Sequence, residues 1–273
     1  MSPDENTPTA WRAGPIAYLH WAGAPHRVPI LFLHPVNTAA AVWRHVVTCL
    51  AGERAAIAVD YRGHGRSASG GPYLPRDYAE DALRVLDDAR VARAHVVCGS
   101  IGGAVAVELA ALAPDRVLSI CAFGAGLRIG WSEEQLQAVE TELRRVGVRA
   151  WFTRHGAGIL GPDARPGAAR ELAELASRGV DGPRDPDVVV EVIRATFGQA
   201  DSRPAAQRLR QPPPARVFVG LHDPTCPLEA GRELAKYLGG EVDMMPGLGH
   251  LPMLEDPRAT AAAIREFLAG LDG

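Results

Sequence analysis

Three residues of this chain are of the types that together carry out acyl transfer: Ser100, Asp223 and His250. A serine hydroxyl attacks a carbonyl carbon when a base removes its proton, and a histidine serves as that base when a carboxylate fixes its tautomer. The predicted chemistry is attack by Ser100, with His250 as the base and Asp223 as the group that orients the imidazole. Water activated by His250 would then hydrolyse the acyl-enzyme.

Ser100 lies in residues 95–113, HVVCGSIGGAVAVELAALA, between a short apolar segment and an alanine-rich one. This pattern predicts a strand, a sharp turn and a helix. A serine exposed at such a turn has a strained backbone, so the residues two positions away on either side must be small. Cys98 and Gly102 meet that demand, and Gly103 would let the helix approach the sheet. The alternative is a glycine-rich turn with an incidental serine.

Asp223 and His250 each follow a predicted strand, in VFVGLHDP and PGLGHLPMLEDP. With Ser100 they occur in the chain order serine, aspartate, histidine, and in this the sequence resembles the α/β-hydrolases. The resemblance covers nearly the whole chain apart from its middle. It implies a mostly parallel sheet of the eight-stranded type flanked by helices. The alternatives are a turn aspartate and an exposed loop histidine.

The resemblance also implies an oxyanion hole made by the amides of Val36 and Ile101. In the segment HPVN, Pro35 stands where the family usually has glycine. Proline has no N–H group and a fixed φ, but the expected donor is the next residue, so Val36 can still donate. Whether Pro35 tilts the loop is left open. His34 is expected to order this loop rather than to act as a base.

The order of predicted elements divides the chain into three parts. Strands and helices alternate up to Gly126, which predicts a parallel sheet with helices on both faces. Helical periodicity then replaces the strand signals, and this segment is expected to form a cap over the carboxyl edge of the sheet. The predicted units are the first part of the core domain, residues 1–126, the helical cap, 127–212, and the second part of the core, 213–273. The predicted cap helices are 132–146, 167–178 and 187–199.

Aromatic residues of the cap either line a substrate pocket or form a core between helices: Trp131, Trp151, Phe152 and Phe197. The segments HPVNTAAAVW, CGSIGG and AGLRIGW resemble the 3-oxoadipate enol-lactonase branch of the family. That branch implies a small acidic lactone or ester, whose carboxylate Arg128 would pair with. The alternative is that Arg128 is a solvated surface charge.

The sequence gives little support for an enzyme that depends on a dinucleotide or a metal ion. Gly63, Gly65 and Ala68 match a dinucleotide fingerprint, but SASGGPYLP follows where the helix of that motif must begin. The histidines show neither HExxH nor HxH spacing, so no metal site is predicted. We therefore expect no cofactor.

Composition and charge limit the classes of binding partner that we expect. The formal net charge is -3 with interspersed signs, which argues against nucleic acid. No stretch of about 18 apolar residues and no secretory signal is present, and the four cysteines are scattered, so a soluble cytoplasmic protein with no membrane association is expected. About ten N-terminal residues are expected to lack regular structure. The sequence does not indicate whether the chain forms a homo-oligomer.

Two functional hypotheses remain. The first is a serine hydrolase that acts on a carboxylic ester or an (enol-)lactone through an acyl-enzyme, with a small molecule as its substrate. The second is a non-hydrolytic or C–C bond-cleaving enzyme on the same fold, a lyase or a cyclase. Nothing in the sequence specifies the acyl group.

Overall fold

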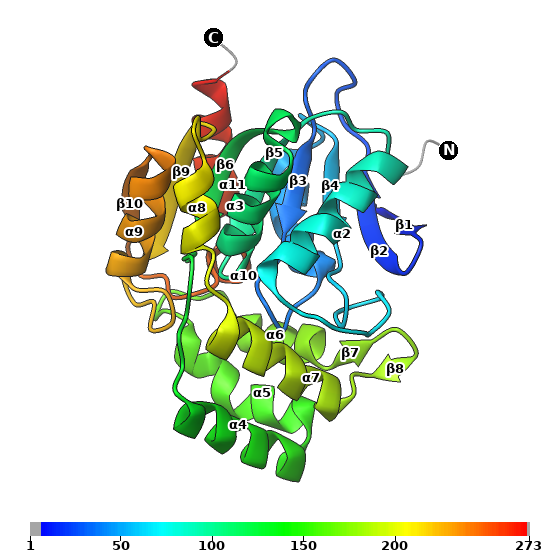
Figure 1. Ribbon diagram of the computed structural model, residues 1–273, viewed down its shortest axis with the longest axis vertical. Helices are drawn as coiled ribbons and strands as arrows, with labels where there is room; N and C mark the ends of the chain where they lie inside the picture. Colours follow the sequence, from blue (N-terminus) through cyan, green and yellow to red (C-terminus); the bar gives the residue numbers. More distant parts are fainter. Residues whose placement is uncertain (1–6, 272–273) are drawn as a thin grey trace.

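The computed structural model describes residues 7–271, in which an eight-stranded sheet carries helices on both faces (Figure 1). The spatial order of the strands is β1-β2-β4-β3-β5-β6-β9-β10. Strand β2 is antiparallel to β1 and β4, and all other pairs are parallel. The predicted fold class is confirmed. The strands are β1 (Thr9–Ala13), β2 (Ile16–Trp21), β3 (Ile30–Leu33), β4 (Ala56–Val59), β5 (Ala94–Gly99), β6 (Val117–Phe123), β9 (Ala215–Gly220) and β10 (Glu241–Met245).

The central strands are buried on both faces because helices cover each side. Every residue of β3 and β4 is buried, as expected for strands of a covered parallel sheet. On one face α2, α3, α8 and α9 pack in a row (Figure 1). On the other face α1 packs against α10 and α11. These helices are α1 (Arg44–Leu50), α2 (Pro75–Asp88), α3 (Gly102–Leu112), α8 (Arg203–Arg208), α9 (Leu228–Leu238), α10 (Pro252–Glu255) and α11 (Pro257–Ala269).

A group of helices inserted between β6 and β9 lies across one end of the sheet, at the bottom of Figure 1. It forms the cap. Its elements are α4 (Glu133–Val146), α5 (Val148–His155), α6 (Ala168–Ala176), the hairpin β7 (Arg178–Gly179) and β8 (Gly182–Pro183), and α7 (Pro186–Ile193), which continues as a π-helical turn at Arg194–Gln199. Ser132 caps the start of α4 with a capping box, since its hydroxyl accepts from the Gln135 amide while the Gln135 side chain accepts from the Ser132 amide.

Some elements differ from the predictions. Strand β1 already begins at Thr9, so the predicted tail is shorter than ten residues; residues 1–6 lie outside the described part of the chain. The alternation of strands and helices predicts a helix after β3, and this helical segment begins at Ala40 as a 3-10 turn that leads into α1. Helix α5 and the β7–β8 hairpin were not predicted. They are too short to show a clear periodicity: α5 packs on the adjacent α4 and α6, and β7 pairs only with β8 among the described strands.

No helix within residues 7–271 is both long and apolar enough to cross a membrane. All four cysteines are free thiols, and Cys98, Cys121 and Cys226 are buried. Burial raises the pKa of each of these three thiols well above its usual range, which keeps them protonated as packing groups.

Candidate active site

Ser100 lies at the turn between the end of β5 and the start of α3. Its φ of +54° is in the left-handed region, which is strained for a residue with a side chain. Two backbone hydrogen bonds hold it there: the Ser100 amide donates to the Phe123 carbonyl (3.1 Å), and the Gly103 amide donates to the Ser100 carbonyl (3.0 Å). The turn therefore presents the hydroxyl at the carboxyl end of the sheet.

The packing around this turn explains its small residues. A Cβ at Gly102 would lie 2.8 Å from the Leu33 carbonyl oxygen and 3.2 Å from the Cys98 Cβ. A Cβ at Gly103 would lie 2.8 Å from the Ala125 Cβ. Both distances are too short for a side chain, so α3 approaches the sheet closely only because these positions are glycine.

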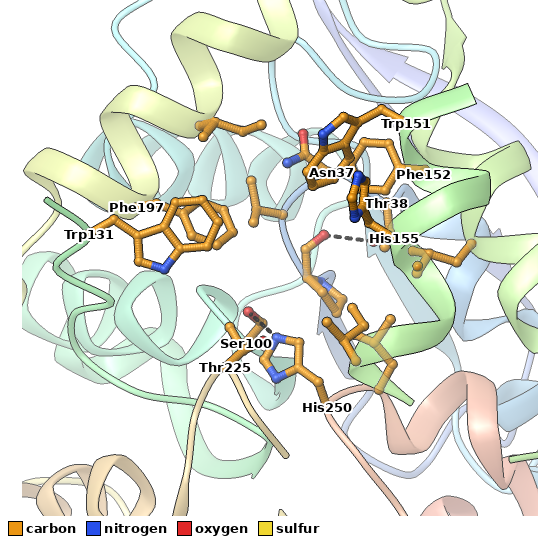
Figure 2. A pocket seen from close by; sticks show the side chains of 17 residues that line it. Asn37, Thr38, Ser100, Trp131, Trp151, Phe152, His155, Phe197, Thr225 and His250 are labelled. Carbon is orange, nitrogen blue, oxygen red and sulfur yellow. Dashed lines mark hydrogen bonds between the residues drawn. The ribbon is translucent and has the colours of Figure 1, made fainter. Parts of the chain in front are cut away.

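Ser100, His250 and Asp223 form one continuous hydrogen-bonded chain. The His250 Nε2 lies 2.9 Å from the Ser100 Oγ, and Figure 2 shows the two side chains facing each other at the pocket. The His250 Nδ1 lies 2.9 Å and 3.0 Å from the two carboxylate oxygens of Asp223. All three residues are buried, although 150 positions separate the serine from the histidine. The structure thus brings together the three residues singled out in the sequence.

The carboxylate of Asp223 is oriented by the turn that follows β9. Its Oδ1 accepts hydrogen bonds from the backbone amides of Thr225 and Cys226, both at 2.8 Å. These donors fix the plane of the carboxylate, which leaves Oδ2 directed at the imidazole of His250. A carboxylate in this position keeps Nδ1 protonated and Nε2 free to accept the serine proton.

A buried glutamate, which sequence reasoning did not single out, organises the loop that carries His250. Glu255 is completely buried, and its carboxylate accepts from the amides of Gly249 (2.7 Å), Leu251 (2.8 Å) and Gly161 (2.7 Å). These donors compensate a buried carboxylate. In the sequence, only the position of Glu255 five residues after His250 could have indicated this role. Because Gly249 and Leu251 flank His250, Glu255 holds the backbone on both sides of that residue.

The predicted oxyanion donors lie on two neighbouring loops. In the described part of the chain, the amides of Val36 and Ile101 donate to no protein acceptor, and Val36 lines the pocket. The loop is anchored through the carbonyl of Pro35, which accepts from His34 Nδ1 (2.8 Å), the Thr38 hydroxyl (2.7 Å) and the Thr38 amide (3.2 Å). Three hydrogen bonds to this one oxygen thus hold the loop in place at Pro35.

His34 orders this loop, as expected. Its Nδ1 donates to Pro35 and its Nε2 accepts from the Tyr61 amide (3.1 Å), so both ring nitrogens are occupied by backbone groups. Burial lowers the pKa of His34 to about 3, which keeps the ring neutral. A ring with both nitrogens engaged in this way is not available as a base.

A pocket between the cap and the core opens onto Ser100 and His250 (Figure 2). It encloses about 680 Å³ of space, counting the part that is open to solvent. Its walls are mostly apolar: the four cap aromatics line it together with Ile159, Leu172, Ile193 and Leu251. The aromatics also pack on one another, with ring centroids 4.5 Å apart for Trp131 and Phe197 and 4.9 Å apart for Trp151 and Phe152. They are therefore both pocket wall and inter-helix core.

Arg128 lies elsewhere. It is exposed and is not part of the pocket wall, and its guanidinium lies so close to Gly130 that a Cβ at that glycine would be 2.6 Å from Nε. Its charge contributes to the lowered pKa of Asp201, which is lowered chiefly by the side-chain hydrogen bond from Arg203 and to a smaller extent by Arg128. The structure therefore does not bring Arg128 together with the other predicted site residues.

No group of three or more metal-binding side chains occurs among the residues that the structure describes. The loop with the dinucleotide-like glycines is closed on itself by a bond from the Gly63 amide to the Ala68 carbonyl (2.9 Å). The next helix, α2, begins only at Pro75. The loop thus does not lead directly into a helix N-terminus, which the fingerprint requires.

Comparison with known proteins agrees with this geometry. The chain is 30% identical over 260 residues to the "Putative non-heme haloperoxidase" of Mycobacterium phage D29, covering 89% of this chain and 88% of the relative. It is 23% identical over 257 residues to 3-oxoadipate enol-lactonase 2 of Acinetobacter baylyi, covering 90% of each. Among solved structures, the enol-lactonase of Burkholderia xenovorans superposes with a TM-score of 0.82 at 24% identity, over 96% of this chain and 100% of that one. The model of the alpha/beta hydrolase family matches residues 30–263, and this chain therefore belongs to that family.

Proposed function

We propose that this protein hydrolyses carboxylic esters or lactones through an acyl-enzyme formed on Ser100. The observation that carries the proposal is the hydrogen-bonded chain from Asp223 through His250 to Ser100, which ends at the wall of an apolar pocket. Nucleophile, base and orienting carboxylate are each within hydrogen-bonding distance of the next, which is the arrangement that acyl transfer needs.

In the proposed mechanism, Ser100 Oγ attacks the carbonyl carbon while its proton moves to His250 Nε2. The amides of Val36 and Ile101 donate hydrogen bonds to the carbonyl oxygen and so stabilise the negative charge that develops on it. The intermediate collapses, and His250 returns the proton to the leaving alkoxide. A water molecule then attacks the acyl-enzyme, with His250 again as the base, and releases the acid and the free serine. With a lactone, the leaving alkoxide stays attached to the acyl chain, so hydrolysis yields one hydroxy acid.

We propose further that the substrate is uncharged around its acyl group. Of the residues described, none that lines the pocket is Lys, Arg, Asp or Glu, and Arg128 lies outside it. His155 lines the pocket, but its Nε2 lies 2.9 Å from the Glu142 carboxylate. A substrate carboxylate would lose its hydration there without gaining a cation, which is unfavourable by several kcal/mol. This argues for a neutral ester or lactone rather than the acidic one that the resemblance implies.

The comparisons support the reaction class more than the substrate. Two of the related proteins are named as enol-lactonases, whereas another relative in the same family is named as a haloperoxidase. Membership of the family alone therefore does not determine which reaction this protein catalyses. The triad and the pocket favour hydrolysis, and C–C cleavage or cyclisation is kept as an outcome of the experiment.

The test is a panel of p-nitrophenyl esters and neutral lactones, each paired with an analogue that carries a carboxylate on the acyl chain. Wild type is expected to hydrolyse the neutral members with a higher kcat/KM than their acidic partners, and Ser100→Ala is expected to be inactive. Labelling of Ser100 by a fluorophosphonate without turnover of any ester or lactone would instead point to non-hydrolytic chemistry. Preference for the acidic partners would contradict the proposed substrate class.

A further inference from the structure

A cationic side chain of the cap is buried against the loop that carries Val36. Arg184 lies between β8 and α7, and only 5% of its surface is exposed. Its Nη1 donates to the side-chain oxygen of Asn37 (2.9 Å). No other described residue accepts from its guanidinium, and no carboxylate within residues 7–271 forms an ion pair with it. A buried guanidinium that lacks a counter-charge opposes folding, so its one contact calls for an explanation.

The acceptor of this bond has an unusual backbone. Asn37 has a φ of +56°, which is strained for a residue with a side chain and is best tolerated by glycine, asparagine and aspartate. It directly follows Val36, and the bond from the Thr38 amide to the Pro35 carbonyl closes the turn around both residues. Because the turn is only four residues long, a change in the backbone of Asn37 would rotate the peptide plane that carries the Val36 amide.

Asn37 is held at two points, one from the core and one from the cap. Its amide donates to the Nε2 of His64 (3.1 Å), and its side chain accepts from Arg184. His64 can accept because its Nδ1 is paired with the Arg62 carbonyl (3.1 Å), which leaves Nε2 unprotonated in the neutral ring. Burial, followed by the charge of Arg184, lowers the pKa of His64 and so maintains this neutral form.

Figure 2 places Asn37 beside Thr38 at the wall of the pocket. Arg184 bonds to the side chain of Asn37 but is not among the residues that line the pocket. A substrate in the pocket therefore meets Asn37 and Val36 but not the guanidinium. If Arg184 affects catalysis, it does so through the loop, and its removal should change the reaction step more than substrate binding.

We propose that Arg184 is a positioning residue, which holds Asn37 in its left-handed conformation from the cap and thereby keeps the Val36 amide directed at the oxyanion. This inference rests on the proposed hydrolytic function for its kinetic part. It couples the docking of the cap to the geometry of the oxyanion hole, although cap residue and donor are 148 positions apart.

The kinetic test compares Arg184→Met, Arg184→Lys, Asn37→Gly and the double variant Asn37→Gly with Arg184→Met. Loss of a whole oxyanion donor lowers kcat by about 10² to 10³-fold, so a misdirected donor should lower it by roughly tenfold or more. We expect that loss in Arg184→Met, with KM changed by less than about threefold, and a partial recovery in Arg184→Lys because an ammonium group also donates to the Asn37 oxygen.

The double variant separates positioning from general stabilisation. Glycine at position 37 accepts the left-handed φ without strain and removes the oxygen that Arg184 binds. If Arg184 acts through Asn37, its replacement should have little further effect in the Asn37→Gly background. Losses that multiply in the double variant would overturn the inference. A kcat of Arg184→Met within about twofold of wild type, in folded protein, would overturn it as well.

A measurement that needs no turnover distinguishes this inference from the proposed function. The backbone amide resonances of Val36 and Asn37 are compared between wild type, Arg184→Met and the matched control Arg178→Met, which replaces an exposed arginine of the same hairpin. We expect both resonances to move in Arg184→Met and to stay in place in the control. Unchanged resonances in Arg184→Met would refute the positioning role, whether or not the wild-type protein hydrolyses esters.

Discussion

Gly124 lies directly against His250: a Cβ at position 124 would be 2.6 Å from the His250 carbonyl oxygen and 2.9 Å from the Asp223 Oδ2. Gly124 follows β6, and its φ of +51° is also in the region that favours glycine. Because Gly124 has no side chain, the turn after β6 leaves room for His250 and for the carboxylate of Asp223. Sequence reasoning did not single out this residue.

The first prediction concerns this contact. Gly124→Ala should displace His250 from Ser100, lower kcat by at least about tenfold, and destabilise the fold by roughly 1 to 3 kcal/mol because of the strained φ. Steady-state kinetics and chemical denaturation measure the two effects. The matched control is Gly158→Ala, in an exposed turn where a Cβ meets nothing within 4 Å. A Gly124→Ala protein with wild-type kcat would show that the histidine loop tolerates the added methyl group.

The second prediction tests the role of Asp223 as the group that orients His250. In Asp223→Asn, the amide oxygen can keep the bonds to Thr225 and Cys226, which places the NH₂ group against the Nδ1 of His250. That ring must then carry its proton on Nε2 and can no longer accept one from Ser100. We expect kcat to fall by roughly 10⁴-fold, as for the same change in other triads, while the melting temperature changes little.

The control for this variant is Asp115→Asn, which changes an exposed carboxylate far along the chain. It should leave kcat unchanged. Full activity in Asp223→Asn would mean that another group fixes the tautomer of His250, and the proposed mechanism would need a different orienting residue.

The third prediction concerns the pocket wall. Trp131 packs on Phe197 and lines the pocket, so Trp131→Ala should remove apolar contacts with a large acyl group (Figure 2). We expect kcat/KM to fall by about tenfold for esters with bulky apolar acyl chains and by much less for acetates, since contacts of this kind are worth roughly 1 to 3 kcal/mol. Trp11→Ala, which replaces an exposed tryptophan on β1, is the control. An equal loss for short and long chains would argue against a pocket for the acyl group.

The fourth prediction concerns stability in acid. Burial lowers the pKa of His34 to about 3 and that of His64 well below its usual range, whereas unfolding returns both toward 6.5. Below about pH 6.5 these two imidazoles therefore bind more protons in the unfolded chain than in the native protein, and their contribution to stability falls as the pH is lowered toward 3. Asp60 acts in the opposite direction, because burial raises its pKa to about 6 and it gains stability as it is protonated.

Comparison of variants isolates the histidine contribution. The free energy of unfolding of His34→Gln should decline less steeply than that of wild type between about pH 6.5 and pH 4, because one of the two buried imidazoles is gone. His26→Gln, which replaces an exposed histidine, should show the wild-type slope. Denaturant titrations across this range make the comparison, and equal slopes for all three proteins would show that His34 does not remain neutral in the native state.

Local patterns in the sequence predict the strands of the large sheet other than β1, the larger helices and the turn that carries Ser100. Each of these signals lies within about 20 neighbouring residues: an apolar run for β5, small residues around the serine, and a capping box at Ser132. Periodicity and capping depend on neighbours along the chain, so they are readable without coordinates. The chain order of Ser100, Asp223 and His250 then indicated the fold family.

Tertiary structure alone decided which distant residues support the site and which do not. Glu255 bonds to amides on both sides of His250, Arg184 reaches Asn37 across 147 positions, and Arg128, close to the cap entry in sequence, is exposed and does not line the pocket. The residue types and their spacing in a sequence do not encode such contacts. The contacts depend on how the cap docks on the core and on which polar groups remain buried once it has docked.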